Sequence, residues 1–318
     1  MFNAQSTVDQ TLDSICRQTY SSLDIIVVDD GSTDASADIV ADFARKDSRI
    51  RLLRQANAGV AAARNRGAAS TSCDFLAFVD ADDLWDPYKI ELQMQAMIDG
   101  GAGVGLVYCW FAQIDGEGRV FSLQFRPRAE GHVLQELCRH NFIGNGSSML
   151  LRRYAFERVG GFDPTLRARK AQGCEDLLIC LRIAESFEFK VVPRHLVGYR
   201  ITNHNMSSDV MQMYRSCEIV LSEFRLKYPQ YAPELDSHLV NMTSWLSIRA
   251  LLGGKFLAAC ALTRNVFRLE RMVTIQRLPW MANVYIRARL VPGWLKSLMS
   301  MVSGKDNRYR PLYTKEKW

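Results

Sequence analysis

An apolar run that ends in a cluster of acidic residues constrains the fold of this chain most strongly. The run from Phe75 to Val79 is typical of a buried strand, and Asp80, Asp82 and Asp83 follow it directly. Carboxylates this close repel one another unless a cation or a polar ligand compensates their charge. A divalent cation that carries a phosphate fits such a cluster, because Mg2+ takes one or two carboxylates together with substrate oxygens. The alternative is an acidic loop in solvent.

A second apolar segment ends in the same way, which favours a binding site over a solvated loop. Residues 24–28 form this segment, and Asp29 and Asp30 follow it. Gly31 permits a sharp turn, and the helical spacing of residues 35–46 predicts a helix after it. The pattern therefore predicts a strand that delivers two acids to a loop before a helix.

The order of the expected elements predicts a parallel α/β sheet. After the first strand and helix come a short strand at residues 50–53, a helix of small residues within 55–67, and the strand at 75–79. A β-α-β-α-β order implies parallel strands joined by right-handed crossovers. Ligands of such sheets bind at the carboxyl ends of the strands, so we expect the acids that follow the two strands to meet there.

Six motifs in this order resemble family 2 glycosyltransferases of the GT-A fold, over roughly residues 1–208. The resemblance implies an α/β domain with a Rossmann-like mixed sheet, which binds a nucleoside-diphosphate sugar and transfers the sugar to an acceptor with inversion at the anomeric carbon. We expect residues 209–318 to form a helical, basic extension. The motifs are Val27–Asp34, Asn57-Ala58-Gly59 with Arg64-Asn65-Gly67, Asp80–Asp83, Gly160–Asp163, Glu175-Asp176 with Leu181-Arg182, and Tyr199-Arg200 with His204-Asn205.

The resemblance implies a set of donor-binding residues. One of Asp29 and Asp30 would accept a hydrogen bond from the base, typically uracil; the alternative is that they compensate the charge of the following helix terminus. Arg64 would pair with the diphosphate or with Asp80, and a structural salt bridge is the alternative. The full expected donor-nucleotide set is Phe2, Asp29, Asp30, Asn57, Gly59, Arg64 and Asp80.

A metal site also follows from the resemblance. Asp80 and Asp82 would hold Mg2+ or Mn2+, which would bridge the two phosphates and neutralise the leaving nucleoside diphosphate. His204 would complete the metal shell or contact the phosphates, and a surface histidine is the alternative. The expected metal ligands are therefore Asp82, Asp80 and His204.

Asp176 is the expected catalytic base, because an inverting transfer needs one carboxylate to accept the proton of the attacking hydroxyl. Glu175 and Asp176 begin an amphipathic helix and point in different directions, so only one can face the sugar. Asp163 is the second candidate, although a role in fixing the acceptor loop is favoured. Arg200 is expected to hold a phosphate.

Two loops are expected beside these residues. The polar span 141–148 precedes a short strand, and we expect it near the donor sugar or the acceptor. Arg167, Arg169 and Lys170 precede the helix of Asp176, and the hypothesis is a mobile basic lid over the diphosphate.

The first residues depart from the family pattern. A central strand is expected before the first helix, but only Phe2 and Asn3 of its final motif are present. Such a strand would contribute about 0.5–1.5 kcal/mol for each of its ladder hydrogen bonds, so its loss would be severe. We therefore expect a misassigned start site or a truncated reading frame, and the alternative is a degenerate gene product.

The charge distribution separates the two halves. Residues 209–318 hold 17 Lys and Arg against 8 Asp and Glu, although the net charge of the whole chain is only +6. A basic extension suits an anionic membrane surface or a lipid-linked acceptor, and a solvated helical cap is the alternative. Short helices within residues 280–302, divided at Pro292-Gly293, carry tryptophans and cations that suit the membrane interface, and a helical subdomain folded onto the catalytic sheet is equally consistent. We expect no nucleic-acid partner.

The eight cysteines form no C-x-x-C pair, which favours free thiols in a reducing compartment. We find neither a signal peptide nor an apolar run of 18 residues, so we expect a cytoplasmic protein, peripheral on the inner face of the plasma membrane.

The leading hypothesis is a glycosyltransferase that adds a single sugar from a nucleotide-sugar, with UDP-sugars favoured, to a glycan or lipid-linked acceptor, as in bacterial surface polysaccharide synthesis. Single addition is favoured because the Gln-x-x-Arg-Trp motif of processive synthases is absent. Two alternatives remain: a non-catalytic nucleotide-binding relic, and a sugar-phosphate nucleotidyltransferase, which would need a glycine-rich loop after its first strand.

Overall fold

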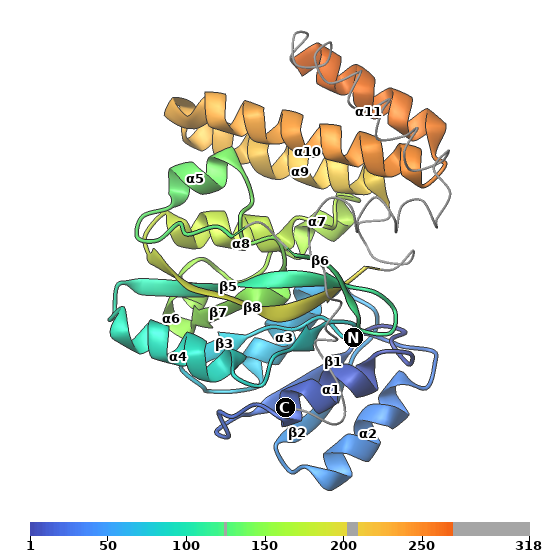
Figure 1. Cartoon of the computed structure of the whole chain (residues 1–318), viewed down its shortest axis with the longest axis vertical. Helices are drawn as coiled ribbons and strands as arrows, with labels where there is room; N and C mark the ends of the chain where they lie inside the picture. Colours follow the sequence, from blue (N-terminus) through green and yellow to red (C-terminus); the bar gives the residue numbers. More distant parts are fainter. Residues whose placement is uncertain (124–125, 202–208, 270–318) are drawn as a thin grey trace, which may run out of the picture.

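The computed structural model describes residues 1–123, 126–201 and 209–269 of the 318-residue chain (Figure 1). The strands are β1 (Ile25–Asp29), β2 (Ile50–Arg54), β3 (Phe75–Ala77), β4 (Leu84–Trp85), β5 (Val104–Ile114), β6 (Val120–Leu123), β7 (Met149–Arg152) and β8 (Glu188–Arg200). The α-helices are α1 (Val8–Cys16), α2 (Ser36–Lys46), α3 (Val60–Ala69), α4 (Lys89–Asp99), α5 (Leu134–Arg139), α6 (Arg153–Arg158), α7 (Thr165–Ala168), α8 (Glu175–Ala184), α9 (Val210–Lys227), α10 (Ala232–Leu252) and α11 (Phe256–Leu269).

The strands form two sheets. β1 and β2 pair in parallel, as their order with α2 predicts. The larger sheet has the order β3-β7-β5-β8-β4, with β6 on β5; β5 and β8 are parallel and the other pairs are antiparallel. The sheet is therefore mixed, as expected. The prediction of a third parallel strand beside β1 and β2 was wrong. Within the described residues, β3 pairs antiparallel with β7 and is not paired with β1 or β2.

Residues 1–7 contain no strand, and α1 begins at Val8. Met1 nevertheless lies along β1: its ammonium donates to the carbonyl oxygen of Val28 at 2.6 Å, and its own carbonyl accepts from the amide of Asp30 at 2.9 Å. Asn3 continues this contact, because its side-chain oxygen accepts from the amide of Thr33 at 2.9 Å. The start of the chain is thus fixed to the loop that follows β1.

The larger sheet separates two apolar clusters. Side chains alternate along a strand, so Tyr108 of β5 joins one cluster and its neighbour Val107 joins the other. The first cluster contains α5 and α8, while the second contains α1 and α4. Both faces of β5 are covered, which agrees with its nearly continuous apolar sequence.

The helices after residue 208 belong to the first cluster. Phe224 of α9 and Leu246 of α10 are buried in one apolar group with Leu177 of α8. Figure 1 shows α9 and α10 lying beside α5 and α8, on the side of the molecule away from β1 and β2. None of the helices in the described part of the chain is long and apolar enough to cross a bilayer. The short helices predicted within 280–302 lie outside the described residues.

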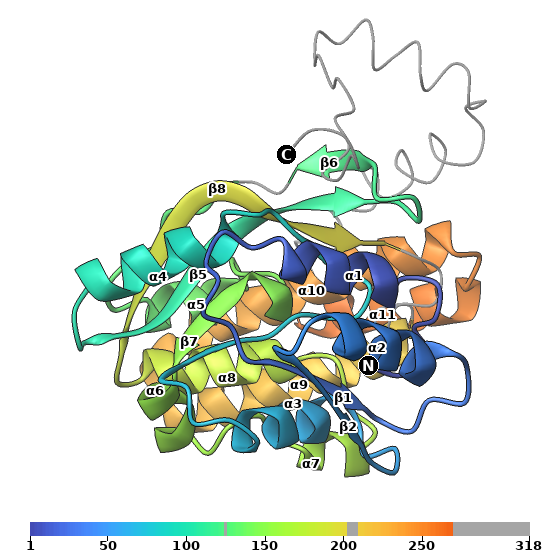
Figure 2. The ribbon, with the colours of Figure 1, turned by 90° about the horizontal axis from the view of Figure 1, so that it is seen from below.

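One edge of the fold collects the loops of the expected site. Both views place α3 beside β1 (Figures 1 and 2), and the two elements are in contact. The loop after β1, the loop before α3 and the turn after β3 come together, although β3 is not paired with β1 or β2. This edge positions the side chains described next.

Candidate active site

One arginine joins three parts of the chain. Arg64, on α3, donates from Nη2 to Oδ1 of Asp80 at 2.6 Å and from Nη1 to Oδ1 of Asp176. Its guanidinium also lies over the ring of Phe162, 5.0 Å from the centroid. The side chain is only 10% exposed, so these contacts are shielded from solvent. The first acid after β3 and the expected base at the start of α8 are thus held by one cation.

Burial and charge act in opposite directions on this group. Burial raises the pKa of Asp176, and Asp80 adds to the rise, while Arg64 opposes it. Burial alone would lower the pKa of Arg64, but the charges of Asp176 and Asp80 outweigh that effect and raise it. Arg64 therefore remains charged and favours the ionised form of Asp176. A carboxylate in this state can accept a proton.

Gly146 allows the Arg64–Asp176 contact to form. A Cβ atom at position 146 would lie 2.7 Å from Nη2 of Arg64 and 2.8 Å from Oδ1 of Asp176. Those distances are shorter than ordinary Cβ contacts, so any larger residue at position 146 would force the Arg64–Asp176 pair to shift. The loop 141–148 was expected near the donor sugar or the acceptor, and its Gly146 lies against the expected base.

A hydroxyl connects the acidic turn to the same loop. Ser147 donates from Oγ to Oδ2 of Asp83 at 2.5 Å and accepts at Oγ from the amide of Asp80 at 3.0 Å. Asp83 is fully buried, and burial, then Asp82 and Asp80, raise its pKa well above the usual range. Asp83 therefore fixes the turn from inside the protein.

Asp82 is the expected metal ligand whose pKa is clearly raised. Burial and the charge of Asp80 raise its pKa to about 6. A carboxylate whose ionised form is opposed by a neighbouring negative charge is a suitable ligand for a divalent ion. No group of three or more His, Cys, Asp or Glu side chains in the described ranges is arranged to hold a metal. The third expected ligand, His204, lies outside those ranges.

The donor-side residues gather around the loop that follows β1. Oδ1 of Asp30 accepts from Nε2 of Gln55 at 2.7 Å and from the amide of Ala58 at 2.8 Å, and Oδ2 accepts from the amide of Gly59 at 2.8 Å. Oδ1 of Asp29 accepts from the amide of Ser32 at 3.0 Å. Both aspartates are buried, and Asp30 clearly positions the loop before α3.

Two further donor-side candidates are more exposed. The Phe2 side chain is 52% exposed, and Asn57 is also exposed. Asn57 packs close to Gly31, whose φ of 80° requires a glycine. These residues therefore lie around the loops after β1 and before α3, with side chains open to a ligand.

Arg200 does not have the environment expected for a phosphate ligand. Its residue is fully buried, and Nε donates to the carbonyl oxygen of Asp82 at 2.6 Å. Nη1 donates to the carbonyls of Asp115 and Gly116 at 3.0 and 2.5 Å, and Nη2 donates to Gln10 at 2.9 Å. The expectation of phosphate contact was wrong because these internal acceptors already hold the guanidinium. Arg200 instead supports the turn that carries Asp82.

The remaining acids have different environments. Glu175 is buried, accepts from the amide of Gly173 at 2.8 Å, and has its pKa raised by burial. Asp163 accepts from the amide and hydroxyl of Thr165 and from Nη2 of Arg182 at 2.9 Å. Asp163 therefore fixes the loop before α7. Of the two acids that begin α8, Asp176 is the one that contacts Arg64.

Sequence reasoning did not identify Gly146, Ser147 and Arg182 as individual contributors. The first two lie in the run Asn145-Gly146-Ser147-Ser148, a polar segment between apolar ones, and that contrast was the available signal. Of the expected basic lid, Arg169 pairs with Glu223 at 2.7 Å, while Arg167 and Lys170 line a separate cavity.

Comparison with known proteins identifies the family of the chain. The family model described as glycosyl transferase family 2 matches residues 1–160. The chain is 30% identical to the putative glycosyltransferase EpsH of Bacillus subtilis, over 77% of this chain and 73% of that protein. It resembles S. aureus TarS 1–349 in complex with UDP-GlcNAc, with a TM-score of 0.58 and 17% identity over 94% of this chain and 81% of that one.

A second solved structure has the same architecture. The mannosyltransferase PcManGT from Pyrobaculum calidifontis, in complex with GDP-Man and Mn2+, is 19% identical with a TM-score of 0.57. The alignment covers 93% of this chain and 86% of that chain. These likenesses show the GT-A fold, and the family match and the EpsH relationship show the kind of enzyme. The chain therefore belongs to glycosyl transferase family 2 and is a nucleotide-sugar-dependent glycosyltransferase.

Proposed function

We propose that this enzyme transfers one sugar, with inversion, from a UDP-sugar to a glycan or lipid-linked acceptor, with Asp176 as the base. The observation that carries the proposal is the bridge from Asp80 through Arg64 to Asp176. Through this bridge, the guanidinium of Arg64 binds both Asp80, the acid proposed for the donor side, and Asp176, the acid proposed to accept a proton. The bound UDP-GlcNAc of TarS and GDP-Man of PcManGT support a nucleotide-sugar donor.

In this proposal, each residue has a defined task. Asp30 holds the loop of Asn57 and Gly59 against the nucleotide. Asp176 accepts the proton of the acceptor hydroxyl as its oxygen attacks the anomeric carbon. Arg64 keeps that carboxylate ionised and fixes its direction. This arrangement favours direct attack and hence inversion.

Asp80 and Asp82 are proposed to hold Mg2+ or Mn2+. The charge of Asp80 raises the pKa of Asp82, which fits a cation at this place. Mg2+ is commonly bound by only one or two carboxylates together with substrate phosphates. When bound, the ion would stabilise the negative charge of the departing nucleoside diphosphate. The Mn2+ in the PcManGT complex supports this assignment.

A thermal-shift experiment with UDP, with and without Mn2+, tests the donor site. UDP at 100 times its Kd should stabilise the chain by about 2.7 kcal/mol. Asp82→Asn should remove the metal-dependent part of that shift, and Asp99→Asn, an exposed control, should leave it unchanged. No stabilisation by any nucleoside diphosphate would contradict the proposal.

Transfer assays test the base. Asp176→Asn should retain UDP binding and lose transfer by a factor of about 100 to 10,000, the usual range for a general base. Full transfer by this variant would show that another group accepts the proton. The control is Asp163→Asn, which alters the contact of Asp163 with Arg182. This variant should lose less activity than Asp176→Asn.

We further propose that the enzyme acts at the inner face of the plasma membrane in surface polysaccharide synthesis. Leu257 and Phe256 of α11 are 90% and 50% exposed and adjoin Lys255, a combination that suits an anionic bilayer surface. Sedimentation with vesicles that contain anionic lipid should recover the protein. Leu257→Ser should weaken this recovery, and equal recovery of both proteins would contradict the membrane contact.

A further inference from the structure

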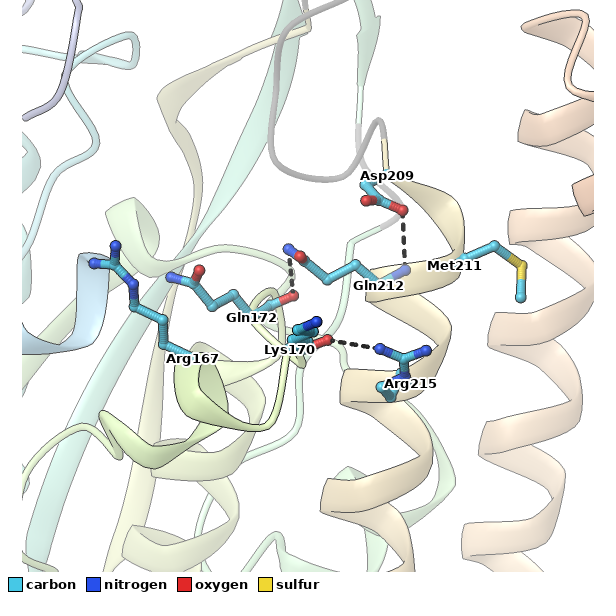
Figure 3. A pocket seen from close by; sticks show the side chains of 7 residues that line it. All are labelled: Arg167, Lys170, Gln172, Asp209, Met211, Gln212 and Arg215. Carbon is cyan, nitrogen blue, oxygen red and sulfur yellow. Dashed lines mark hydrogen bonds between the residues drawn. The ribbon is translucent and has the colours of Figure 1, made fainter. Parts of the chain in front are cut away.

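A cavity of about 420 Å³ opens between the loop after α7 and the first turn of α9 (Figure 3). Cavities of this size accommodate small ligands. We call it the basic pocket. The lining side chains used below are Arg167, Lys170, Gln172, Asp209, Gln212 and Arg215. None of the residues assigned above to the nucleotide or the metal lines it.

The basic pocket has more positive than negative side chains. Arg167, Lys170 and Arg215 line it, and no ion pair to an acid is recorded for any of them within the described residues. Asp209 is the acid that lines the pocket, and its Oδ1 accepts from the amide of Gln212 at 3.0 Å. Arg169, the neighbouring cation, is paired with Glu223 and does not line the pocket. The surplus positive charge is suited to an anionic ligand.

Arg167 has a buried donor with no partner. Its Nη1 is inaccessible to solvent and makes no hydrogen bond in the structure. Figure 3 shows this side chain extending away from α9. Nη1 lies 3.3 Å from where a Cβ of Gly59 would be. A buried guanidinium nitrogen without a partner is costly, and an anionic oxygen would satisfy it.

The pocket is held by contacts between its two walls. Arg215 donates to the carbonyl oxygen of Lys170, and Gln212 donates to that of Gln172, both at 3.4 Å (Figure 3). Lys170 has a φ of 51°, in the left-handed region that is uncommon for a side chain of this kind. Strained residues of this type concentrate at binding sites. The loop then leads through Gln172 directly into α8 and Asp176.

We propose that the basic pocket binds an anionic group of the acceptor, a phosphate or diphosphate. The proposal rests on the proposed sugar transfer and adds the chemical class of the acceptor. The acceptor side is favoured because the loop that forms the pocket leads to the base. Arg167 and Gln172 of the pocket also approach Gly59 of the expected donor set, so the donor side is tested as well. The donor diphosphate is the other source of the same chemistry, and the experiment separates the two.

The test is a calorimetric titration of the chain with inorganic phosphate while saturating UDP and Mg2+ occupy the donor site. Phosphate should bind saturably to this complex. The Lys170→Gln/Arg215→Gln variant should bind it at least tenfold more weakly and bind UDP as the parent does. Both residues are exposed, so the substitutions should preserve the fold. The charge-matched control, Arg158→Gln/Arg225→Gln, should bind phosphate normally.

Asp209→Asn removes a negative charge from the basic pocket, whereas the double variant removes two positive charges. Asparagine also caps helices, so α9 should persist while the pocket loses its negative charge. This variant should bind phosphate about two- to fivefold more tightly, since one repulsive charge is removed in a partly solvated site. Unchanged or weaker binding would contradict the role given to the pocket charges.

The outcomes separate this inference from the proposed function. Failure of UDP to bind would overturn the sugar-transfer proposal itself. Displacement of UDP by phosphate would place the anion in the donor site and overturn the inference alone. The inference alone would also be overturned if phosphate failed to bind while UDP remained bound. It would likewise be overturned if the Lys170→Gln/Arg215→Gln variant bound phosphate like its control.

Discussion

Arg64 and Asp176 are 112 positions apart in the sequence, yet they share a partly buried hydrogen bond in the candidate active site. The same guanidinium binds Asp80, so the positions of the two carboxylates depend on each other. Under the roles proposed for Asp80 and Asp176, a displacement of Arg64 would affect donor binding and proton transfer together. From the sequence, a structural salt bridge and a functional contact were alternatives for Arg64. In the proposed mechanism, the same contacts serve both purposes.

Arg64→Gln should move the pH dependence of transfer. Arg64 lowers the pKa of Asp176 against the effect of burial, so its removal raises that pKa. More of the base is then protonated at a given pH, and the acidic limb of the kcat/KM profile should shift to higher pH. We expect kcat to fall about 100-fold, as when a charged active-site donor is lost.

The matched control for this variant is Arg51→Gln. Arg51 makes an exposed ion pair with Asp24, so its loss should leave both the pH profile and kcat unchanged. An Arg64→Gln profile that overlays the parent profile would refute the role of Arg64 in setting the ionisation of Asp176.

Gly146→Ala tests the close approach of the backbone. Its Cβ would lie within 2.8 Å of the Arg64–Asp176 pair, so the pair must move apart. We expect kcat/KM to fall about 10- to 100-fold, as for other small displacements of catalytic groups. Gly116→Ala is the control, because a Cβ there meets nothing within 4 Å. Equal kcat/KM values for the two variants would contradict this prediction.

The sequence predicted the parts of the fold that depend on local patterns. The apolar runs and the acids after them predicted β1, β2 and the edge where Asp30 and Asp80 lie. The pairing of β3 was not predictable in this way, because its partner β7 follows more than 70 residues later and no local signal encodes an antiparallel pairing.

In the candidate site, too, local features were predictable from the sequence and long-range contacts were not. The acids could be identified from their positions at strand and helix ends, but the environment of each could not. Arg200 illustrates this: it was expected to hold a phosphate, and its burial against the carbonyls of Asp82 and Asp115 is visible only in the folded chain. Ser147 was missed individually for the same reason, because both of its partners lie more than 60 residues away.

Asp30→Asn should weaken UDP binding. Its carboxylate accepts from the amides of Ala58 and Gly59, and an asparagine can provide only one oxygen for these donors. Hydrogen bonds to charged groups contribute about 1.5–3 kcal/mol, so a loss of about tenfold or more in UDP affinity is expected. Calorimetric titration of UDP measures this, and Asp24→Asn, at the other end of β1, should bind like the parent.

Lys89 should make the stability of the fold depend on alkaline pH. It is fully buried, donates to Oε1 of Gln93 at 2.6 Å, and burial lowers its pKa from 10.5 to about 8. Between these two values the unfolded chain holds a proton that the folded chain has released. The free energy of unfolding attributable to Lys89 therefore rises with pH through this window and is lost as pH falls through 8.

Urea unfolding of the parent chain and of Lys89→Met at pH 7, 8, 9 and 10 isolates this effect. The parent should gain stability relative to the variant by about 2–3 kcal/mol between pH 7 and 10, since each unit of pKa difference corresponds to 1.36 kcal/mol. Lys46→Met, which removes an exposed lysine of α2, should follow the parent at every pH. Parallel curves for the parent and Lys89→Met would show that Lys89 is charged in the folded protein throughout this range, because the carbonyl of Gln93 and the ring of Trp85, 4.0 Å away, stabilise the ammonium enough to offset its burial.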